Sequence, residues 1–323
     1  MKQLRFHETG HPSKVLQLED VPKPVPAEGE ALVKVSLCNM IPADIMYIMG
    51  QYGLRPQLPA GGGFEAVGVV EETGAGVALP QGMRVSFTAL GVWQEYVVVS
   101  AKTLVPIPDS IPDEVACQAF VNPLTAYGML ETANVTEGQW LLLTAGNSAF
   151  SRFVVQLCKE RGIKAICTVR SDEQIQPLLD MGASHVINVK KDDLARTIYQ
   201  ITEKKGVNAC FESVGGETGE AALNSLGMGG IMLVYGLLSL KNPAFNQGLM
   251  IFKDITVKGF WLTNYLNTLG GKAMKELVTE VIGKLASNTL QASVEATYSL
   301  DDFQEAIKAF ETPGRQGKIL LRP

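Results

Sequence analysis

A turn of small residues between an apolar strand and a helix constrains this chain most. The apolar run Trp140–Leu143 is typical of a buried parallel strand and leads directly into the turn Thr144–Ser151. The next segment, Arg152–Gly162, has apolar residues at helical spacing, ends on a C-cap glycine and precedes a second apolar strand, Lys164–Val169. Strand, turn, helix and strand predict the first βαβ unit of a dinucleotide-binding domain. The turn puts backbone N–H groups at a helix N-terminus, where a pyrophosphate can bind.

The glycine fingerprint of that turn is degenerate. Where the pattern G-x-G-x-x-G is expected, the chain has Gly146, Ser148 and Ser151. Small residues still allow a close approach of the backbone, so the prediction of phosphate binding depends on the βαβ context; the turn alone fits a plain αβ crossover equally well. The residues of the turn that we expect to contact the cofactor are Gly146, Asn147, Ser148, Ala149 and Phe150.

Length and composition limit the classes of protein that this chain can represent. Its 323 residues favour two domains, and 46% hydrophobic with 19% charged residues indicate a well-buried globular protein. A net charge of −5 without a basic block argues against nucleic acid as a partner. No apolar run approaches the length of a membrane span, and no signal or transit pattern is recognisable. The five cysteines show no C-x-x-C spacing, so we expect reduced, buried thiols in a cytoplasmic protein.

The order of predicted elements indicates an α/β protein with a β-rich first part. Residues 1–110 contain short strands punctuated by Gly and Pro clusters, the last of them at Trp93–Val99. A helix is predicted over 113–132, after which strands and helices alternate, which predicts a parallel sheet covered by helices. A long helix over 271–286, a further helix and a short strand end the chain.

Several segments resemble the medium-chain dehydrogenase/reductase superfamily. They are the stretch around Asp44, the turn Pro59–Gly68 and the later segment Leu179–Ile187. The resemblance covers essentially the whole chain and implies a GroES-like catalytic domain from 1–112 with 265–323. It also implies a doubly wound Rossmann nucleotide-binding domain from 113–264, with the active site in the cleft between the two.

The superfamily divides on zinc, and this chain departs from the zinc-dependent pattern. Zinc-dependent alcohol dehydrogenases carry a cysteine three residues before the aspartate that matches Asp44, and here that residue is Ile41. They carry a histidine where this chain has Phe64. Neither side chain can bind Zn²⁺, and the four-cysteine lobe of the structural zinc is missing. We therefore expect no metal and a zinc-independent oxidoreductase.

Without a Lewis acid, an activated C=C bond is the alternative hydride acceptor, and it needs a proton donor. Tyrosine has an ordinary pKa of about 10, so it remains protonated at neutral pH and can donate. The segment Ile41–Pro56 resembles the catalytic segment of mitochondrial 2-enoyl thioester reductases. In that group the tyrosine of the Gly-x-Tyr turn, here Tyr52, is the proposed proton donor. We interpret Tyr47, on a predicted helix, as a packing residue; the alternative for Tyr52 is an ordinary loop aromatic.

Two further segments resemble the same group. Val121–Tyr127 is similar to its Asn-Pro-x-Thr-Ala-Tyr motif, which implies that Asn122 contacts the cofactor. Ile251–Leu262 matches its Phe-Lys-Asp…Gly-Phe-Trp signature. The residues that the resemblance then implies beside the cofactor are Tyr235, Gly236, Phe260, Trp261, Leu262, Thr263 and Lys318. Core or interface packing is an equal alternative for Phe260 and Trp261, and the edge strand of such a domain often pairs across a two-fold axis, so we expect a homodimer.

The end of the second Rossmann strand indicates which cofactor is bound. NAD-binding folds place an acid there, whereas this chain has Arg170 and Ser171, and a guanidinium suits the 2′-phosphate of NADPH. Asp172 stands where the resembled reductases often have a second arginine, which weakens that phosphate site.

These observations predict an NADPH-dependent reductase of trans-2-enoyl thioesters of CoA or acyl carrier protein, an activity of fatty acid metabolism. An NADPH:quinone oxidoreductase shares the fold, and a non-catalytic nucleotide-binding protein is a third possibility.

Overall fold

The computed structural model describes residues 1–323 and divides into two compact units. Unit 1 comprises Met1–Val121 with Glu280–Pro323, and unit 2 comprises Asn122–Thr279. The junctions expected from the sequence are 112/113 and 264/265. No helix is long and apolar enough to cross a membrane.

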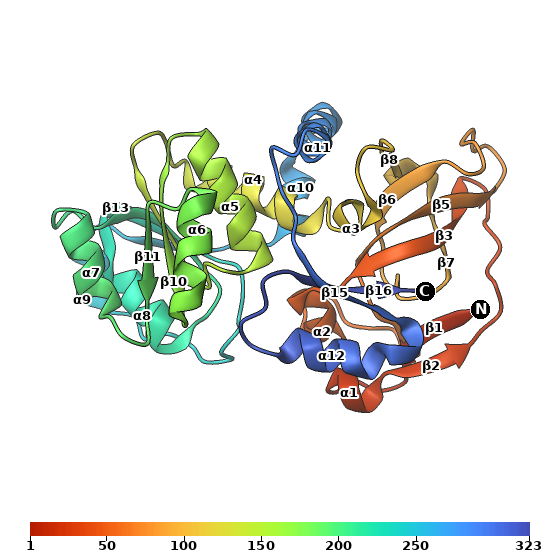
Figure 1. Ribbon diagram of the computed structural model, residues 1–323, viewed down its shortest axis with the longest axis horizontal. Helices are drawn as coiled ribbons and strands as arrows, with labels where there is room; N and C mark the ends of the chain where they lie inside the picture. Colours follow the sequence, from red (N-terminus) through yellow and green to blue (C-terminus); the bar gives the residue numbers. More distant parts are fainter. The chain divides into compact units, whose positions relative to one another are not determined.

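Unit 1 is built on two β-sheets (Figure 1). The larger has seven strands, ordered β15-β16-β3-β5-β6-β8 with β7 also paired to β3, and the smaller has the order β2-β1-β4. The strands are β1 (Lys2–Phe6), β2 (Gln17–Asp20), β3 (Glu30–Asn39), β4 (Ala60–Gly61), β5 (Glu65–Thr73), β6 (Arg84–Thr88), β7 (Tyr96–Ser100), β8 (Val105–Pro106), β15 (Val294–Ser299) and β16 (Lys318–Arg322). The helices are α1 (Pro12–Val15), α2 (Pro42–Ile48), α3 (Asp113–Ala116) and α12 (Phe303–Glu311), with short 3₁₀ turns at Ala101–Thr103 and Leu300–Asp302.

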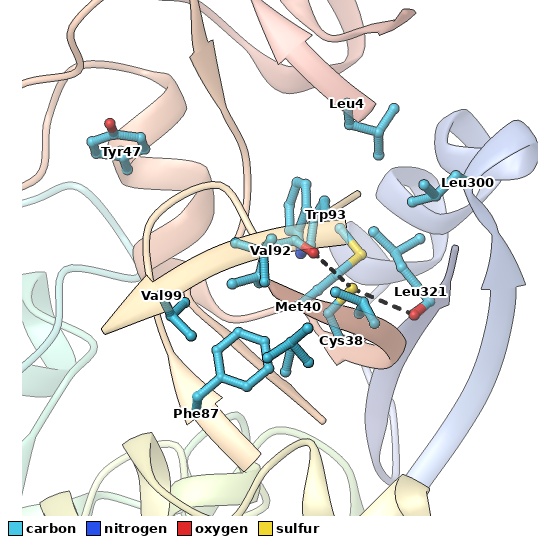
Figure 2. Close-up of a cluster of buried hydrophobic side chains, with 14 of the residues drawn as sticks. Leu4, Cys38, Met40, Tyr47, Phe87, Val92, Trp93, Val99, Leu300 and Leu321 are labelled. Carbon is cyan, nitrogen blue, oxygen red and sulfur yellow. Dashed lines mark hydrogen bonds between the residues drawn. The ribbon is translucent and has the colours of Figure 1, made fainter. Parts of the chain in front are cut away.

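The core of unit 1 joins the two distant segments of the chain. Figure 2 shows Cys38 of β3 with its thiol directed at the carbonyl oxygens of Val92 and Leu321, at 3.6 and 3.5 Å. Trp93 is fully buried, and its indole N–H donates to the carbonyl of Asn39 at 3.2 Å. The side chain of Trp93 also explains why residue 63 is glycine. A Cβ on Gly63, where φ is +94°, would lie 2.4 Å from the indole. This contact fixes the backbone immediately before β5, where the candidate site begins.

Unit 2 contains a six-stranded sheet with order β11-β10-β9-β12-β13-β14, and all of its pairings are parallel. The strands are β9 (Trp140–Leu143), β10 (Lys164–Val169), β11 (His185–Asn188), β12 (Val207–Glu212), β13 (Leu226–Val234) and β14 (Thr256–Gly259). The helices are α4 (Val121–Ala133), α5 (Ala149–Glu160), α6 (Ile175–Met181), α7 (Leu194–Ile201), α8 (Gly216–Asn224), α9 (Gln247–Phe252), α10 (Leu262–Thr268) and α11 (Gly271–Ala286), which crosses the junction of the units; a 3₁₀ turn spans Asp172–Gln174. Helices α5 and α6 pack beside β10 and β11 (Figure 1). The predicted parallel sheet is confirmed.

Two predicted elements differ from the structure. The helix expected over 113–132 is two helices, because the carboxylate of Glu65 accepts hydrogen bonds from the backbone N–H groups of Phe120 and Val121 and starts α4 there. The strand expected from Trp93 begins only at Tyr96, because the backbone of Trp93 forms its hydrogen bonds with Gly62 and Leu4 instead. All five cysteines are free and buried, as the sequence predicts.

Candidate functional site

The turn before α5 brings the backbone of the first βαβ unit against the second strand. The N–H of Gly146 donates to the carbonyl of Thr168 on β10 at 2.8 Å, and Ala145 has a φ of +49°. A Cβ at Gly146 would lie 2.5 Å from Cβ of Cys167, so only glycine fits there. The single glycine that remains of the fingerprint is therefore the one required for contact between turn and strand.

The serines of the degenerate fingerprint cap the helix. Ser148 is the N-cap residue of α5, and its Oγ accepts the N–H of Ser151 at 3.1 Å. The N–H groups of Ala149 and Phe150 donate to no acceptor of the chain. Free N–H groups at the start of a helix are suited to an anion. The turn therefore fits the pyrophosphate of a dinucleotide.

Tyr235 and Gly236 follow β13 and lie near this turn. The ring of Tyr235 packs against that of Phe150 with 4.3 Å between centroids. Burial raises the pKa of the Tyr235 hydroxyl, and hydrogen bonding to Ser213, Ser151 and Ser148 opposes the rise. A Cβ on Gly236 would lie 2.7 Å from Cβ of Ser213, so the chain after β13 passes close to the chain after β12. Tyr235 thus stays a neutral phenol beside the predicted pyrophosphate turn.

Arg170 and Ser171 follow β10, and Arg170 is exposed. Asp172, which from the sequence is expected to weaken the 2′-phosphate site, is bound to Asn188 and Lys191. Its carboxylate accepts the side-chain amide of Asn188 at 2.6 Å and forms an ion pair with Lys191, which lowers the pKa of Asp172. The negative charge of Asp172 is therefore offset locally by a lysine.

The remaining predicted cofactor residues lie in a packing contact or at the start of a helix. Phe260 packs with Tyr265 at 5.7 Å between centroids and lies close to Gly128 of α4, which is the packing role that the sequence left open. Trp261 is the N-cap residue of α10, with Leu262 and Thr263 in the first turn of that helix. Asn122 lies in the first turn of α4.

Tyr52, the predicted proton donor, belongs to an aromatic cluster of unit 1. It lies in the turn after α2, half-buried, and its ring centroid is 5.3 Å from that of Phe64. Phe64 also packs edge-on against Tyr47 at 5.4 Å. Tyr47 is 4% exposed, and burial raises the pKa of its hydroxyl, so its interpretation as a packing residue is confirmed. Phe64 thus supports the side of Tyr52 at the position that the zinc-dependent pattern gives to a histidine.

Unit 1 also contains three buried charged side chains: Asp44, Glu65 and Lys318 are 0%, 1% and 5% exposed. Burial raises the pKa of Asp44 well above its usual range, opposed by the hydrogen bond from the Ile41 N–H and by the charge of Lys318. Burial lowers the pKa of Lys318 to about 8, opposed by Glu65 and Asp44. The Nζ of Lys318 donates to the carbonyl of Met40 at 3.4 Å. The structure therefore places Lys318, expected beside the cofactor, inside unit 1 with two carboxylates.

The carboxylates of this cluster accept hydrogen bonds from the backbone where two helices begin. Asp44 accepts the N–H of Ile41 at 2.6 Å, which starts α2, the helix that ends before Tyr52. Glu65 accepts the N–H of Phe120 at 2.6 Å and the amide of Asn39 at 2.9 Å, and burial raises the pKa of Glu65 to about 7. The cluster holds two carboxylates and one amine, so complete ionisation would bury a net negative charge.

No three His, Cys, Asp or Glu side chains group so as to hold a metal ion. The side chains of Ile41 and Phe64 carry no donor atom, and the nearby thiol of Cys38 donates to carbonyl oxygens in the core.

Comparison with known proteins identifies the family. Residues 27–109 match the model of the alcohol dehydrogenase GroES-like domain, and residues 151–280 match that of the zinc-binding dehydrogenase. The mitochondrial enoyl-[acyl-carrier-protein] reductase of Xenopus tropicalis is 32% identical over 332 residues, covering 98% of this chain and 94% of that protein. The chain belongs to the medium-chain dehydrogenase/reductase superfamily. The human mitochondrial enoyl-[acyl-carrier-protein] reductase is 30% identical over 99% of this chain and 88% of its own length.

Solved structures of superfamily members share the whole fold. The Escherichia coli quinone oxidoreductase complexed with NADPH superposes with a TM-score of 0.92 at 30% identity, covering all of both chains. The Pseudomonas syringae quinone oxidoreductase superposes with a TM-score of 0.89 at 28% identity, covering 100% of this chain and 99% of that one. The α/β fold with a GroES-like unit and a Rossmann unit is therefore confirmed. These relatives are oxidoreductases: two are named enoyl-[acyl-carrier-protein] reductase and two quinone oxidoreductase.

Sequence reasoning missed two features of the site. Asp44 and Glu65 served only as landmarks of motifs, yet they are the buried acids that accept the backbone N–H groups at the starts of α2 and α4. Arg152, in the first turn of α5, folds back to donate to Asn147 in the phosphate turn at 3.0 Å. The positive charge of Arg152 was the signal available in the sequence, because a cation is unfavourable near a helix N-terminus.

Proposed function

We propose that this protein is an NADPH-dependent, zinc-independent reductase of activated C=C bonds, with a trans-2-enoyl thioester as its substrate. One observation carries the proposal: Phe64 replaces a metal-binding histidine with an aromatic ring, and that ring packs against Tyr52. The site therefore offers a phenol as its acid. The enoyl reductase names of relatives such as the Xenopus and human proteins support the thioester as substrate.

The residues of the α5 turn are suited to hold the cofactor. The free N–H groups of Ala149 and Phe150 would donate hydrogen bonds to the pyrophosphate, and the exposed guanidinium of Arg170 would donate to the 2′-phosphate. Lys191 offsets the charge of Asp172, so that carboxylate does not oppose NADPH. When bound, NADPH supplies a hydride to C3 of the substrate.

Tyr52 completes the addition. The π electron pair of the C2=C3 bond moves toward the thioester carbonyl and gives an enolate, which hydrogen-bond donors stabilise. The O–H bond of Tyr52 breaks, a C2–H bond forms, and the phenolate then regains a proton from water. Phe64 packs against the Tyr52 ring and is itself packed against Tyr47, so the phenol is positioned before the substrate arrives.

The test is NADPH oxidation with crotonyl-CoA, a longer 2-enoyl-CoA and a simple quinone. Tyr52→Phe is compared with Tyr47→Phe, which removes a hydroxyl from the same aromatic cluster. We expect enoyl turnover to fall at least about 100-fold in Tyr52→Phe, as for loss of a general acid, and to persist in Tyr47→Phe. Equal activity of the two variants would refute the role of Tyr52.

Quinone reduction is the second candidate, favoured by the structural similarity to quinone oxidoreductases. A quinone needs no positioned carbon acid. If quinone turnover is the same in wild type and Tyr52→Phe, and neither protein reduces an enoyl thioester, this alternative would be established. A comparison of crotonyl-CoA with crotonyl-acyl carrier protein tests which thioester carrier is used.

We also propose that the protein acts as a homodimer through unit 2. Strand β14 is an edge strand with an unpaired side. The segment that leads to it carries exposed apolar side chains, namely Leu237, Leu238, Leu240, Phe245, Ile251 and Phe252. An exposed apolar patch beside a free strand edge is suited to pairing with a second copy.

A further inference from the structure

We propose that Arg152 is a cofactor-binding residue that supplies positive charge to the pyrophosphate at the turn before α5. The inference rests on the proposed dinucleotide cofactor and adds a residue outside the glycine fingerprint. It names the pyrophosphate as the group that Arg152 recognises, as distinct from the 2′-phosphate assigned above to Arg170.

The direction of the Arg152 side chain is the first observation. Long side chains of a helix point toward its N-terminus. Nη1 of Arg152 donates to Oδ1 of Asn147 at 3.0 Å, and Asn147 lies between Gly146 and the N-cap residue Ser148. The guanidinium is therefore beside the turn whose N–H groups remain free at Ala149 and Phe150.

The electrostatic surroundings of Arg152 are the second observation. The guanidinium is half-buried, forms no ion pair, and its pKa is lowered by burial with no acid to oppose the change. It also lies near the positive end of the helix dipole of α5, where a cation is unfavourable. Both effects destabilise the free protein. An anion shared by the guanidinium and the helix N-terminus would offset both at once.

The degenerate fingerprint is the third observation that supports a role for the charge of Arg152. At the second and third glycine positions the chain has Ser148 and Ser151, whose side chains bond to each other and cap α5. The Oγ of Ser148 is therefore occupied in capping α5. A guanidinium that already reaches the turn can supply charge-assisted hydrogen bonds to the phosphate oxygens.

The alternative role for Arg152 is purely structural, a clamp on the amide of Asn147. Two variants separate the roles. Arg152→Gln keeps a hydrogen-bond donor but removes the charge, whereas Arg152→Lys keeps the charge. Arg196→Gln, an exposed arginine on α7, is the matched control for loss of one positive charge in the same unit.

The experiment measures the Kd of NADPH and of NADH by fluorescence titration at several salt concentrations. We expect Arg152→Gln to raise both Kd values by the same factor, at least about tenfold, as for loss of a charge-assisted bond. The salt dependence of binding should also weaken, because one fewer charge meets the phosphates. Arg152→Lys should retain most of the affinity, and Arg196→Gln should match the wild type. Arg170→Ser should weaken NADPH binding alone.

Two failures are distinguishable. If the wild type binds neither dinucleotide, the proposed cofactor is wrong. If the wild type binds both and Arg152→Gln binds them equally well while its thermal unfolding is unchanged, the inference about Arg152 is overturned. A loss confined to NADPH would assign Arg152 to the 2′-phosphate and also overturn it.

Discussion

Replacement of Glu65 by glutamine tests whether the buried charge cluster sets the pH dependence of stability. Glutamine preserves the volume of the side chain, and its carbonyl oxygen can accept the N–H of Phe120. Its NH₂ group would face the amide nitrogen of Asn39. Oδ1 of Asn39 has no hydrogen-bond partner, so rotation of that amide provides an acceptor. The substitution therefore removes an ionisable group with little change in packing.

The magnitude follows from the pKa of Glu65. Burial raises it from 4.5 to about 7. Between these values the folded protein holds a proton that the unfolded chain has lost, so the free energy of unfolding falls as the pH rises. At about 1.4 kcal/mol for each pH unit, the wild type loses about 3 kcal/mol over this interval. Above about pH 7 this contribution is constant.

The assay is urea unfolding of wild type and Glu65→Gln between about pH 5 and about pH 7.5, a range that stays below the pKa of about 8 that Lys318 has in the wild type. We expect the variant to gain most of the 3 kcal/mol on the wild type as the pH rises. Asp44 is present in both proteins, so its own titration largely cancels in the difference. Glu72→Gln, which replaces an exposed acid of the same strand that pairs with Lys23 at 3.3 Å, reports the effect of an acid-to-amide change at the surface.

A constant difference in stability between wild type and Glu65→Gln across this range would refute the reasoning. That result would mean that the carboxyl of Glu65 titrates alike in the folded and unfolded protein, despite its burial.

Two further changes test the turn and the proposed dimer. Gly146→Ala places a Cβ 2.5 Å from Cβ of Cys167, so we expect about 1–3 kcal/mol of destabilisation and loss of NADPH binding, measured by thermal unfolding and fluorescence titration. A folded variant with unchanged affinity would contradict the assigned geometry. Leu238→Glu with Phe245→Glu puts two charges on the exposed apolar segment, and light scattering coupled to size exclusion should change from dimer to monomer. A wild type that is already monomeric at micromolar concentration would rule out the dimer.

The sequence alone was sufficient for the fold of unit 2. Apolar runs such as Trp140–Leu143 and Lys164–Val169 are buried on both faces of a parallel sheet, so their apolar composition indicates directly that they are strands of such a sheet. The helix over 271–286 was predicted with its bounds, because its periodicity extends over four turns. The assignment of Tyr52 as proton donor also came from consecutive residues of a motif, and it stays a prediction.

The contacts between segments that are distant in sequence were decided by the tertiary structure. No local pattern shows that Glu65 accepts the N–H of Phe120, so the break between α3 and α4 could not be predicted. Lys318 was expected beside the cofactor from motif position, and only the packing of β16 against β3 shows it with two buried carboxylates.

The chemistry of the site divides in the same way. The sequence by itself determined which donor atoms are present: a tyrosine in the turn after α2, no metal ligands at Ile41 and Phe64, and an arginine after β10. Tertiary structure decided how those groups are used, since charges such as Asp172 and Lys191 neutralise each other only once the chain brings them together. Residue identity fixes the chemistry that is possible, whereas pKa and orientation depend on burial and on neighbours that only the fold supplies.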